Sequence, residues 1–272
     1  MTTELQSISL KRTIVEIVKT PKVLPVFLML FCIGVIYSSL SEFSRHTETL
    51  LWLSAFTFYL TIYQNGYRIS YARNIYLSDQ KRLPLFSSLI NHTRRGFGKL
   101  VISLVTLLAA YVPCTILFTV LADFTLVDFD GLIVQEILRT VPPLVAIIPC
   151  TFWWAGYASS DRLFTKRTFP SIIASFTRYK QASIVLIGVE ILRFMLVEIG
   201  NELLSMVSPS ATSPLLFSSS GVAIALILLQ SLVSTGGILF LGNLSGQYAR
   251  LAYGQEDSGK PIAEAETVPN VL

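Results

Sequence analysis

The chain has 272 residues, of which 52% are hydrophobic and only 14% are charged. A soluble domain usually carries about 25% charged residues, so a soluble fold of this length would have too few charges to cover its apolar surface. The basic residues, which give a net charge of +4, stand between apolar runs, and this placement favours a membrane surface over nucleic acid as their partner. Composition therefore predicts an integral membrane protein whose main partner is the lipid bilayer, with no nucleic acid bound.

Six apolar runs follow one another along the chain, each close to the ~17–25 residues that a helix needs to cross the hydrocarbon core of a bilayer. Helices satisfy their own backbone hydrogen bonds in lipid, and the short alternating segments typical of a membrane β-barrel are absent from the sequence. We therefore predict an all-α fold, a polytopic transmembrane helical bundle of six spans. The runs cover about 23–40, 50–65, 100–121, 141–158, 182–205 and 221–243.

Basic residues accumulate at alternate connections between these runs. Eighteen of the 21 lysines and arginines lie in the N-terminal segment, the second-to-third connection (with Arg68 and Lys99), the fourth-to-fifth connection and the C-terminal tail. The positive-inside rule then places both termini in the cytoplasm and the protein in the cell (inner) membrane, where the basic loops would meet anionic lipids. The expected organisation is a cytoplasmic amphipathic segment at 1–22, a six-span membrane domain at 23–246 and a cytoplasmic, disordered tail at 247–272.

A weak internal repeat accompanies the runs. Gly66–Tyr67, Gly156–Tyr157 and Gly246–Gln247–Tyr248 stand at the ends of the second, fourth and sixth runs, with the glycines 90 residues apart. Tyrosines gather at the same ends, as in the aromatic belts of membrane proteins. Short amphipathic stretches that suit the membrane interface precede the first, third and fifth runs, so we expect three interfacial-helix-plus-hairpin repeats; chance spacing is the alternative. These stretches are 8–18, 85–97 and 171–176.

The residues at these boundaries resemble a known family. Gly66–Tyr67, Arg73 and Leu83–Pro84, followed by a basic amphipathic stretch, resemble an uncharacterised family of prokaryotic six-span membrane proteins known only as a domain of unknown function, and 246–250 is similar to that family's end motif. The segment 169–176 is similar to the YciC-like inner-membrane family and to membrane domains attached to glycerophosphodiester phosphodiesterases. The resemblance covers most of the chain. It implies the six-span architecture and a cell-membrane location, and it supplies no activity.

Two charged residues interrupt the fifth run. Glu190 and Arg193 lie near its middle, three residues apart and therefore on one helical face, where they can pair. A charge at the centre of a bilayer costs about 2.5–3.5 kcal/mol on insertion scales, so such residues are candidates for a proton relay, a substrate contact or a gate. A structural ion pair that faces the bundle interior is the alternative, and the sequence leaves both open.

The sixth run carries small residues at helical spacing: Ser231, Thr235, Gly242 and Gly246. Small residues allow the backbones of two membrane helices to approach closely. This helix-packing seam predicts close packing inside the bundle, and an interface between two copies of the chain is the less favoured reading.

No motif in the sequence predicts catalysis. The cysteines Cys32, Cys114 and Cys150 are too widely spaced for a metal site, and no Walker A loop, G-x-S-x-G or H-E-x-x-H motif is present. We therefore expect no cofactor, no metal and no enzymatic activity. The first hypothesis is a non-enzymatic scaffold or accessory component of the cell membrane. The alternative is a transporter or permease subunit that moves a small solute and uses Glu190 and Arg193; a lipid enzyme is a weaker third.

Overall fold

The computed structural model describes a helical chain. It places residues 8, 10–20, 22–46, 51–77, 83–84, 88–124, 131–163, 176–207 and 221–253. The helices are α1 (Leu10–Lys19), α2 (Val23–His46), α3 (Leu51–Leu77), α4 (Leu89–Phe124), α5 (Gly131–Ser160), α7 (Lys180–Val207) and α9 (Gly221–Tyr253). The prediction of an all-α fold is confirmed for these ranges, in which no strand occurs.

Three helices in the described ranges are long and apolar enough to cross a membrane: α4 over Leu89–Leu117, α5 over Arg139–Ser160, and α9 over its whole length. α1 and α2 add a fourth if the two, which meet at a bend of 100°, form one broken span. α3 and α7 are 27 and 28 residues long, but charged and amide side chains interrupt their apolar sequence. The chain is therefore helical with several membrane-length apolar helices, and six spans stay a prediction.

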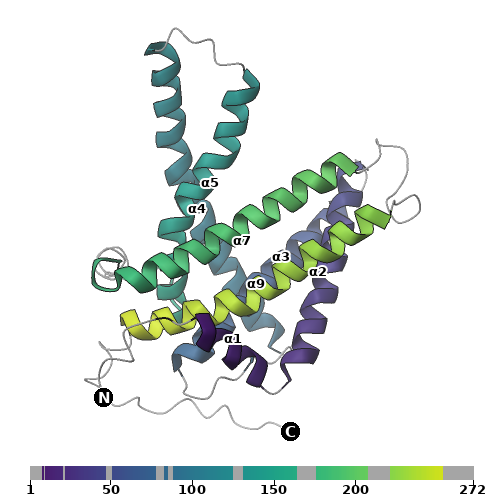
Figure 1. Cartoon of the computed structure of the whole chain (residues 1–272), viewed down its shortest axis with the longest axis vertical. Coiled ribbons are helices and arrows are strands. Elements are labelled where there is room, and N and C mark those ends of the chain that lie inside the picture. Colours follow the sequence, from purple (N-terminus) through teal and green to yellow (C-terminus); the bar gives the residue numbers. More distant parts are fainter. Residues whose placement is uncertain are drawn as a thin grey trace.

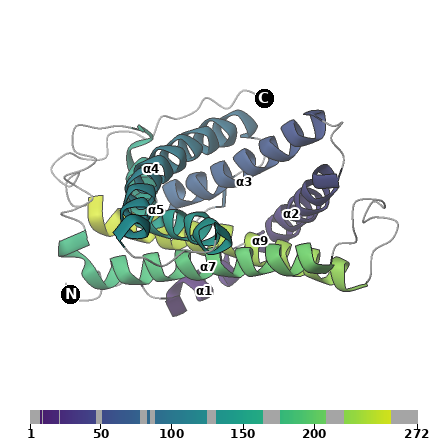
Figure 2. The ribbon, with the colours of Figure 1, turned by 90° about the horizontal axis from the view of Figure 1, so that it is seen from above.

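α3 and α9 form the centre of the bundle. α3 contacts α2, α4, α5 and α9, and α9 also contacts α1, α2, α5 and α7. Figures 1 and 2 show the other helices around this pair, with α4 and α5 forming a hairpin that diverges from the far ends of α7 and α9. At the opposite end α3 and α5 end while α4 and α7 begin. We call this the Asp161 end, because Asp161 directly follows α5.

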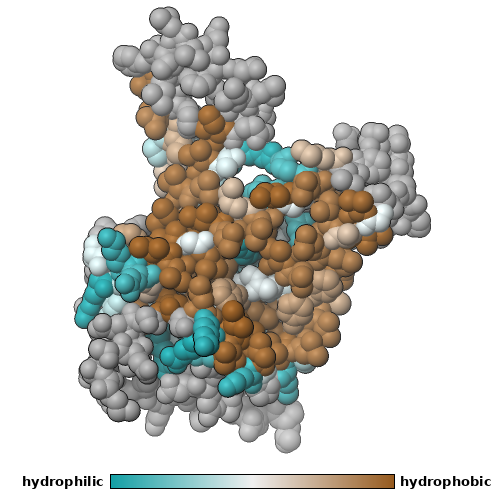
Figure 3. All heavy atoms as spheres, in the orientation of Figure 1, coloured by the Kyte–Doolittle hydropathy of each residue, from teal (hydrophilic) through white to brown (hydrophobic). Residues whose placement is uncertain are grey.

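The outer faces of the helices are apolar. Leu104, Leu108 and Val112 follow one another along α4 and are 55–57% exposed. Figure 3 shows hydrophobic atoms over most of the visible surface of the bundle. In water such a continuous patch would promote aggregation, whereas in a bilayer it faces the acyl chains. The surface thus agrees with the composition in favouring lipid as the surrounding solvent.

α1 has an inverted amphipathic pattern. Its polar side chains Thr13 and Glu16 are buried, whereas Ile14 and Val18 are 54% and 71% exposed. Gln247 of α9 donates a hydrogen bond to Thr13 over 3.0 Å, which holds the polar face against the bundle. A short helix that turns its apolar face outward suits the membrane interface, and the interfacial position of the stretch 8–18 stays a prediction.

Several described helices extend past the predicted limits, and two of these extensions change the predicted organisation. α4 runs unbroken from Leu89 to Phe124, so residues 89–97 of the amphipathic stretch predicted at 85–97 are the first part of a long helix rather than a separate interfacial one; residues 85–87 lie outside the described ranges. α9 continues to Tyr253, so 247–253 are helical and do not belong to a disordered tail. The reason is packing, since Tyr248 is fully buried against the bundle. Residues 164–175 and 254–272 lie outside the described ranges.

The backbones of α3 and α4 touch where two glycines meet. A Cβ atom added to Gly66 would lie 1.6 Å from the carbonyl oxygen of His92, and one added to Gly96 would lie 1.9 Å from the carbonyl oxygen of Ile62. Only residues without a side chain allow this approach. The crossing fixes α3 against α4 and so places Arg68 and Lys99, which stand just beyond the two glycines, in one region of the bundle interior.

Candidate functional site

A buried ion pair joins α3 to α7. Arg68 donates from Nη1 to Glu190 Oε1 over 2.9 Å and from Nη2 to Glu190 Oε2 over 3.0 Å, and both side chains are only 3% exposed. Two parallel hydrogen bonds of this kind use both carboxylate oxygens and give a strong, directional pair. The sequence predicted Arg193 as the partner, but Arg193 Nη1 lies 3.9 Å from Glu190 Oε1, so Arg68 is the closer cation.

Lys99 of α4 belongs to the same region. Its Nζ donates to Asn65 Oδ1 over 2.5 Å and lies 4.1 Å from the ring centre of Trp154 on α5, while the guanidinium of Arg68 lies 5.0 Å from that ring. An amide and an aromatic face attract a cation but carry no net charge, so neither neutralises Lys99. We define the charge cluster as Arg68, Lys99, Trp154, Glu190 and Arg193.

The sequence missed Arg68 and Lys99 as site residues. α3 continues to Leu77 and α4 begins at Leu89, so both side chains lie within helices and not in the connection to which we had assigned them. The sequence has no proline or turn motif between Arg68 and the apolar run before it. This lack of a helix-ending signal could have indicated that Arg68 belongs to the same helix as the run. Both residues still lie nearer to the Asp161 end than to the far end of their helices. The excess of basic residues that the sequence predicts for one side of the membrane therefore stays on the side of the Asp161 end.

Arg193 occupies space that a glycine leaves open. A Cβ atom added to Gly237 of α9 would lie 2.6 Å from Arg193 Cδ and 2.7 Å from Arg193 Nε. At the adjacent Gly236 no atom lies within 4 Å of an added Cβ. Gly237 therefore provides the space that the Arg193 side chain fills between α7 and α9, and it adds α9 to the helices that shape the cluster.

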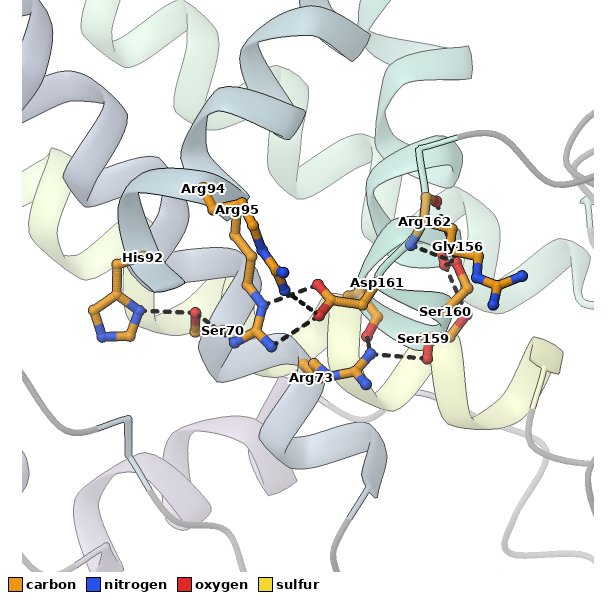
Figure 4. A network of polar contacts seen from close by, with 11 residues as sticks. Ser70, Arg73, His92, Arg94, Arg95, Gly156, Ser159, Ser160, Asp161 and Arg162 are labelled. Atoms are coloured by element: carbon orange, nitrogen blue, oxygen red, sulfur yellow. Dashed lines mark hydrogen bonds and ion pairs between the residues drawn. The ribbon is translucent and has the colours of Figure 1, made fainter. Parts of the chain in front are cut away.

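A second group of charges lies at the Asp161 end. Figure 4 shows Asp161 facing Arg94 and Arg95 of α4. Arg94 Nη2 donates to Asp161 Oδ2 over 2.8 Å, and Arg95 donates from Nε and Nη2 over 3.1 and 3.2 Å. Asp161 has a φ of 57°, a left-handed conformation that aspartate tolerates and that commonly follows the end of a helix. The group therefore ties the start of α4 to the end of α5.

Arg73 and His92 also form hydrogen bonds at the Asp161 end. Arg73 Nη1 donates to the carbonyl oxygens of Ala158 and Ser159 over 3.2 and 3.1 Å, which satisfies acceptors that the last turn of α5 leaves free. The hydroxyl of Ser70 lies 2.8 Å from Nδ1 of the buried His92 and accepts a hydrogen bond from Arg95. We call Arg73, Arg94, Arg95 and Asp161 the arginine layer.

The stability contributed by Asp161 should depend on pH. Burial alone would raise the pKa of Asp161, but the hydrogen bond from Arg95 and the charges of Arg95, Arg73 and Arg94 outweigh it and lower the pKa below 3.8. A lowered folded-state pKa means that the contribution is complete above the unfolded value of about 3.9 and is lost as pH falls through the folded-state value. Asp161→Asn should therefore destabilise the protein at neutral pH and remove this part of the acid dependence, as thermal unfolding in detergent can measure.

A graded pair of substitutions controls that experiment. The Arg95 side chain is 15% exposed and the Arg94 side chain 62% exposed, so solvent screens Arg94 more strongly. Arg95→Gln should lower the melting temperature more than Arg94→Gln. Equal effects, or an unchanged acid profile in Asp161→Asn, would contradict the assignment of the lowered pKa to Asp161.

Comparison with protein-family models, with curated proteins and with solved structures finds no match. The family resemblance of the boundary motifs therefore stays a prediction. The described ranges contain no group of three histidine, cysteine or carboxylate side chains that could hold a metal.

The predicted seam of α9 lies inside the bundle. Gly34 of α2 faces Ser231, with 3.3 Å between its added Cβ and Ser231 Cβ. At Gly242 and Gly246 an added Cβ would lie 2.9 Å from Tyr71 Cδ1 and 2.5 Å from Ile75 Cβ, both on α3. Thr235 is fully buried. Ser231 therefore lies against α2, and Gly242 and Gly246 lie against α3.

The residues of the predicted repeat have unequal surroundings. Gly66 touches the backbone of α4 and Gly246 that of α3, whereas Gly156 has room for a Cβ, which would lie 3.5 Å from the hydroxyl of Tyr253. The three tyrosines of the repeat are at most 4% exposed and so do not face the membrane interface: Tyr67, Tyr157 and Tyr248. The threefold repeat stays a prediction.

Proposed function

We propose that the chain is a six-span protein of the cell membrane with both termini in the cytoplasm. The helices with membrane-length apolar sequence support the spans, and the concentration of cations at the Asp161 end supports the orientation, because lysine and arginine are retained on the cytoplasmic side. Arg94, which is exposed at this end, is placed to meet the headgroups of anionic lipids.

Cysteine labelling tests this topology. Cys32, Cys114 and Cys150 are first replaced by serine or alanine, and single cysteines are introduced as Gln80→Cys, Thr165→Cys, His46→Cys and Asp130→Cys. A membrane-impermeant maleimide should label positions 46 and 130 in intact cells and positions 80 and 165 only after the membrane is opened. Labelling of positions 80 and 130 from the same side would contradict the six-span arrangement.

We further propose that the protein is a transporter or permease component that moves a small charged solute through the charge cluster. The observation that carries this proposal is the meeting of Arg68, Lys99, Glu190 and Arg193, from three helices, in the bundle interior. Charged residues within membrane helices are costly and usually mark substrate or ion pathways. A non-enzymatic scaffold, which the sequence favoured, needs no such cluster. The proposal keeps the expectation that the chain is not an enzyme.

Flux measurements on the purified protein in sealed lipid vesicles test this function. Vesicles loaded with radiolabelled phosphate, sulfate or rubidium should lose at least one of these ions faster than protein-free vesicles, and Glu190→Gln together with Arg193→Leu should abolish the difference. Gly236→Ala, at a site with free space, is the matched control and should keep the wild-type rate. Equal leakage from vesicles with and without protein for all three ions would reject the proposal.

A further inference from the structure

We propose that Lys99, Trp154 and Arg193 form a binding site for an oxyanion of the phosphate type, either a free ion or the headgroup of an anionic lipid. This inference rests on the proposed function, and it goes further by giving the sign of the charge and the oxygen chemistry of the ligand. Three features support it: the charge balance of the cluster, its unpartnered donors and the arginine layer on the same helices.

The charges of the cluster do not balance. It contains the cations Arg68, Lys99 and Arg193 but one carboxylate, Glu190, and both oxygens of that carboxylate are taken by Arg68. Lys99 is 4% exposed and makes its hydrogen bond to a neutral amide. Buried charges are normally paired, because leaving one unpaired costs several kcal/mol. Lys99 has no carboxylate partner among the described residues, and Arg193, whose side chain is 27% exposed, reaches Glu190 only over 3.9 Å. The cluster therefore has an excess of positive charge that attracts an anion and repels a cation.

Two N–H donors of the charge cluster have no partner in the part of the chain that the structure describes. Within the described ranges, Arg193 Nε and Trp154 Nε1 are buried and have no hydrogen-bond acceptor. Trp154 is 8% exposed, and its ring already faces the cations of Arg68 and Lys99. Buried N–H groups are rarely left unsatisfied. A water molecule could accept from them but would leave the charge unbalanced, whereas an oxyanion supplies both acceptor oxygens and negative charge.

The arginine layer offers a route to this site. Arg95 and Lys99 lie four residues apart on α4, and Arg73 and Arg68 lie five apart on α3, so cations on the same two helices continue from the cluster to the Asp161 end. That layer contains three arginines and a single carboxylate, Asp161. Successive positive groups of this kind attract an anion from outside and raise its local concentration.

Binding of inorganic phosphate to the purified, delipidated protein in detergent tests the proposal by isothermal titration calorimetry. Wild-type protein should bind phosphate, and Lys99→Gln and Arg193→Gln should each weaken binding at least tenfold. Gly237→Ala should also weaken it, because the added Cβ would displace Arg193, and this variant keeps the test decisive if the charge variants fail to fold. Gly236→Ala, the neighbouring control, should bind like wild type.

A second arm distinguishes the two sources of the phosphate group. Native mass spectrometry of protein from nanodiscs of phosphatidylglycerol or phosphatidylcholine would reveal a retained lipid. Phosphatidylglycerol retained by wild type and lost in Gly237→Ala, without binding of inorganic phosphate, would assign the site to a lipid headgroup. Failure of both ligands, or binding that Lys99→Gln, Arg193→Gln and Gly237→Ala all leave unchanged, would overturn the proposal. Phosphate binding without flux of any ion would reject transport and keep the site.

Discussion

Gly66→Ala should destabilise the protein by more than about 4 kcal/mol, a loss at the high end for a single substitution and one that severe overpacking can cause. The added Cβ would lie 1.6 Å from the carbonyl oxygen of His92 and 2.8 Å from the backbone nitrogen of Gly96. Because these are backbone atoms, no side-chain rotation relieves the overlap, and α3 and α4 must separate. Unfolding titrations in mixed micelles with dodecyl sulfate measure this loss of stability. The separation of α3 from α4 should also disrupt the charge cluster.

Gly188→Ala is the matched control. Gly188 lies within α7, and nothing lies within 4 Å of an added Cβ there. An alanine in such a position should be neutral or stabilise the helix by up to about 1 kcal/mol, because glycine is the poorer helix former. If Gly66→Ala behaved like Gly188→Ala, the α3–α4 crossing described above would be wrong.

Glu190→Gln should destabilise the protein by about 3–5 kcal/mol, the usual cost of removing one partner of a buried ion pair. The substitution leaves Arg68, Lys99 and Arg193 together without a carboxylate. Arg68→Gln should cost less, since Glu190 then keeps Arg193, whose Nη1 is 3.9 Å from its Oε1, and since the cluster loses one of its excess positive charges. The same unfolding titration measures both losses of stability. Because the cluster has an excess of positive charge, the loss in Glu190→Gln should be larger than the loss in Arg68→Gln.

The double variant completes a cycle that isolates the pair. Arg68→Gln with Glu190→Gln removes both hydrogen-bonding charges, so its cost should be smaller than the sum of the two single costs by at least about 1 kcal/mol, as expected for residues in direct contact. Strict additivity would show that the two side chains do not interact. A larger cost for Arg68→Gln than for Glu190→Gln would contradict the excess of positive charge.

The helical fold was predictable from the sequence because its cause is local. Long apolar runs specify helices in lipid whatever their neighbours, and a described helix covers nearly all of each of the six runs. Helix ends were less predictable, since they depend on packing: α3 and α9 extend past the predicted limits because Tyr71, Tyr67 and Tyr248 are buried against other helices. Hydropathy alone ends a span at the first polar residue and misses polar side chains that face inward.

The candidate site was predictable only in part. Glu190 and Arg193 were found because charges interrupt an apolar run, which is visible in one sequence. The closer partner, Arg68, is 122 residues away along the chain, and no local pattern indicates such a contact. Gly66 was noticed for its spacing, whereas the structure places it at a backbone crossing. The role of Gly237 was equally hidden, because it depends on where α7 lies against α9.

An anion bound among the helices can be located by diffraction. Crystals of the protein grown in lipid and soaked with selenate, a tetrahedral oxyanion, should give an anomalous selenium peak within hydrogen-bond distance of Arg193 Nε and Lys99 Nζ, and Gly237→Ala should abolish it. An occupied selenate position elsewhere with no peak at the charge cluster, or a carboxylate of the protein paired with Lys99, would contradict a cationic cluster built to hold an anion.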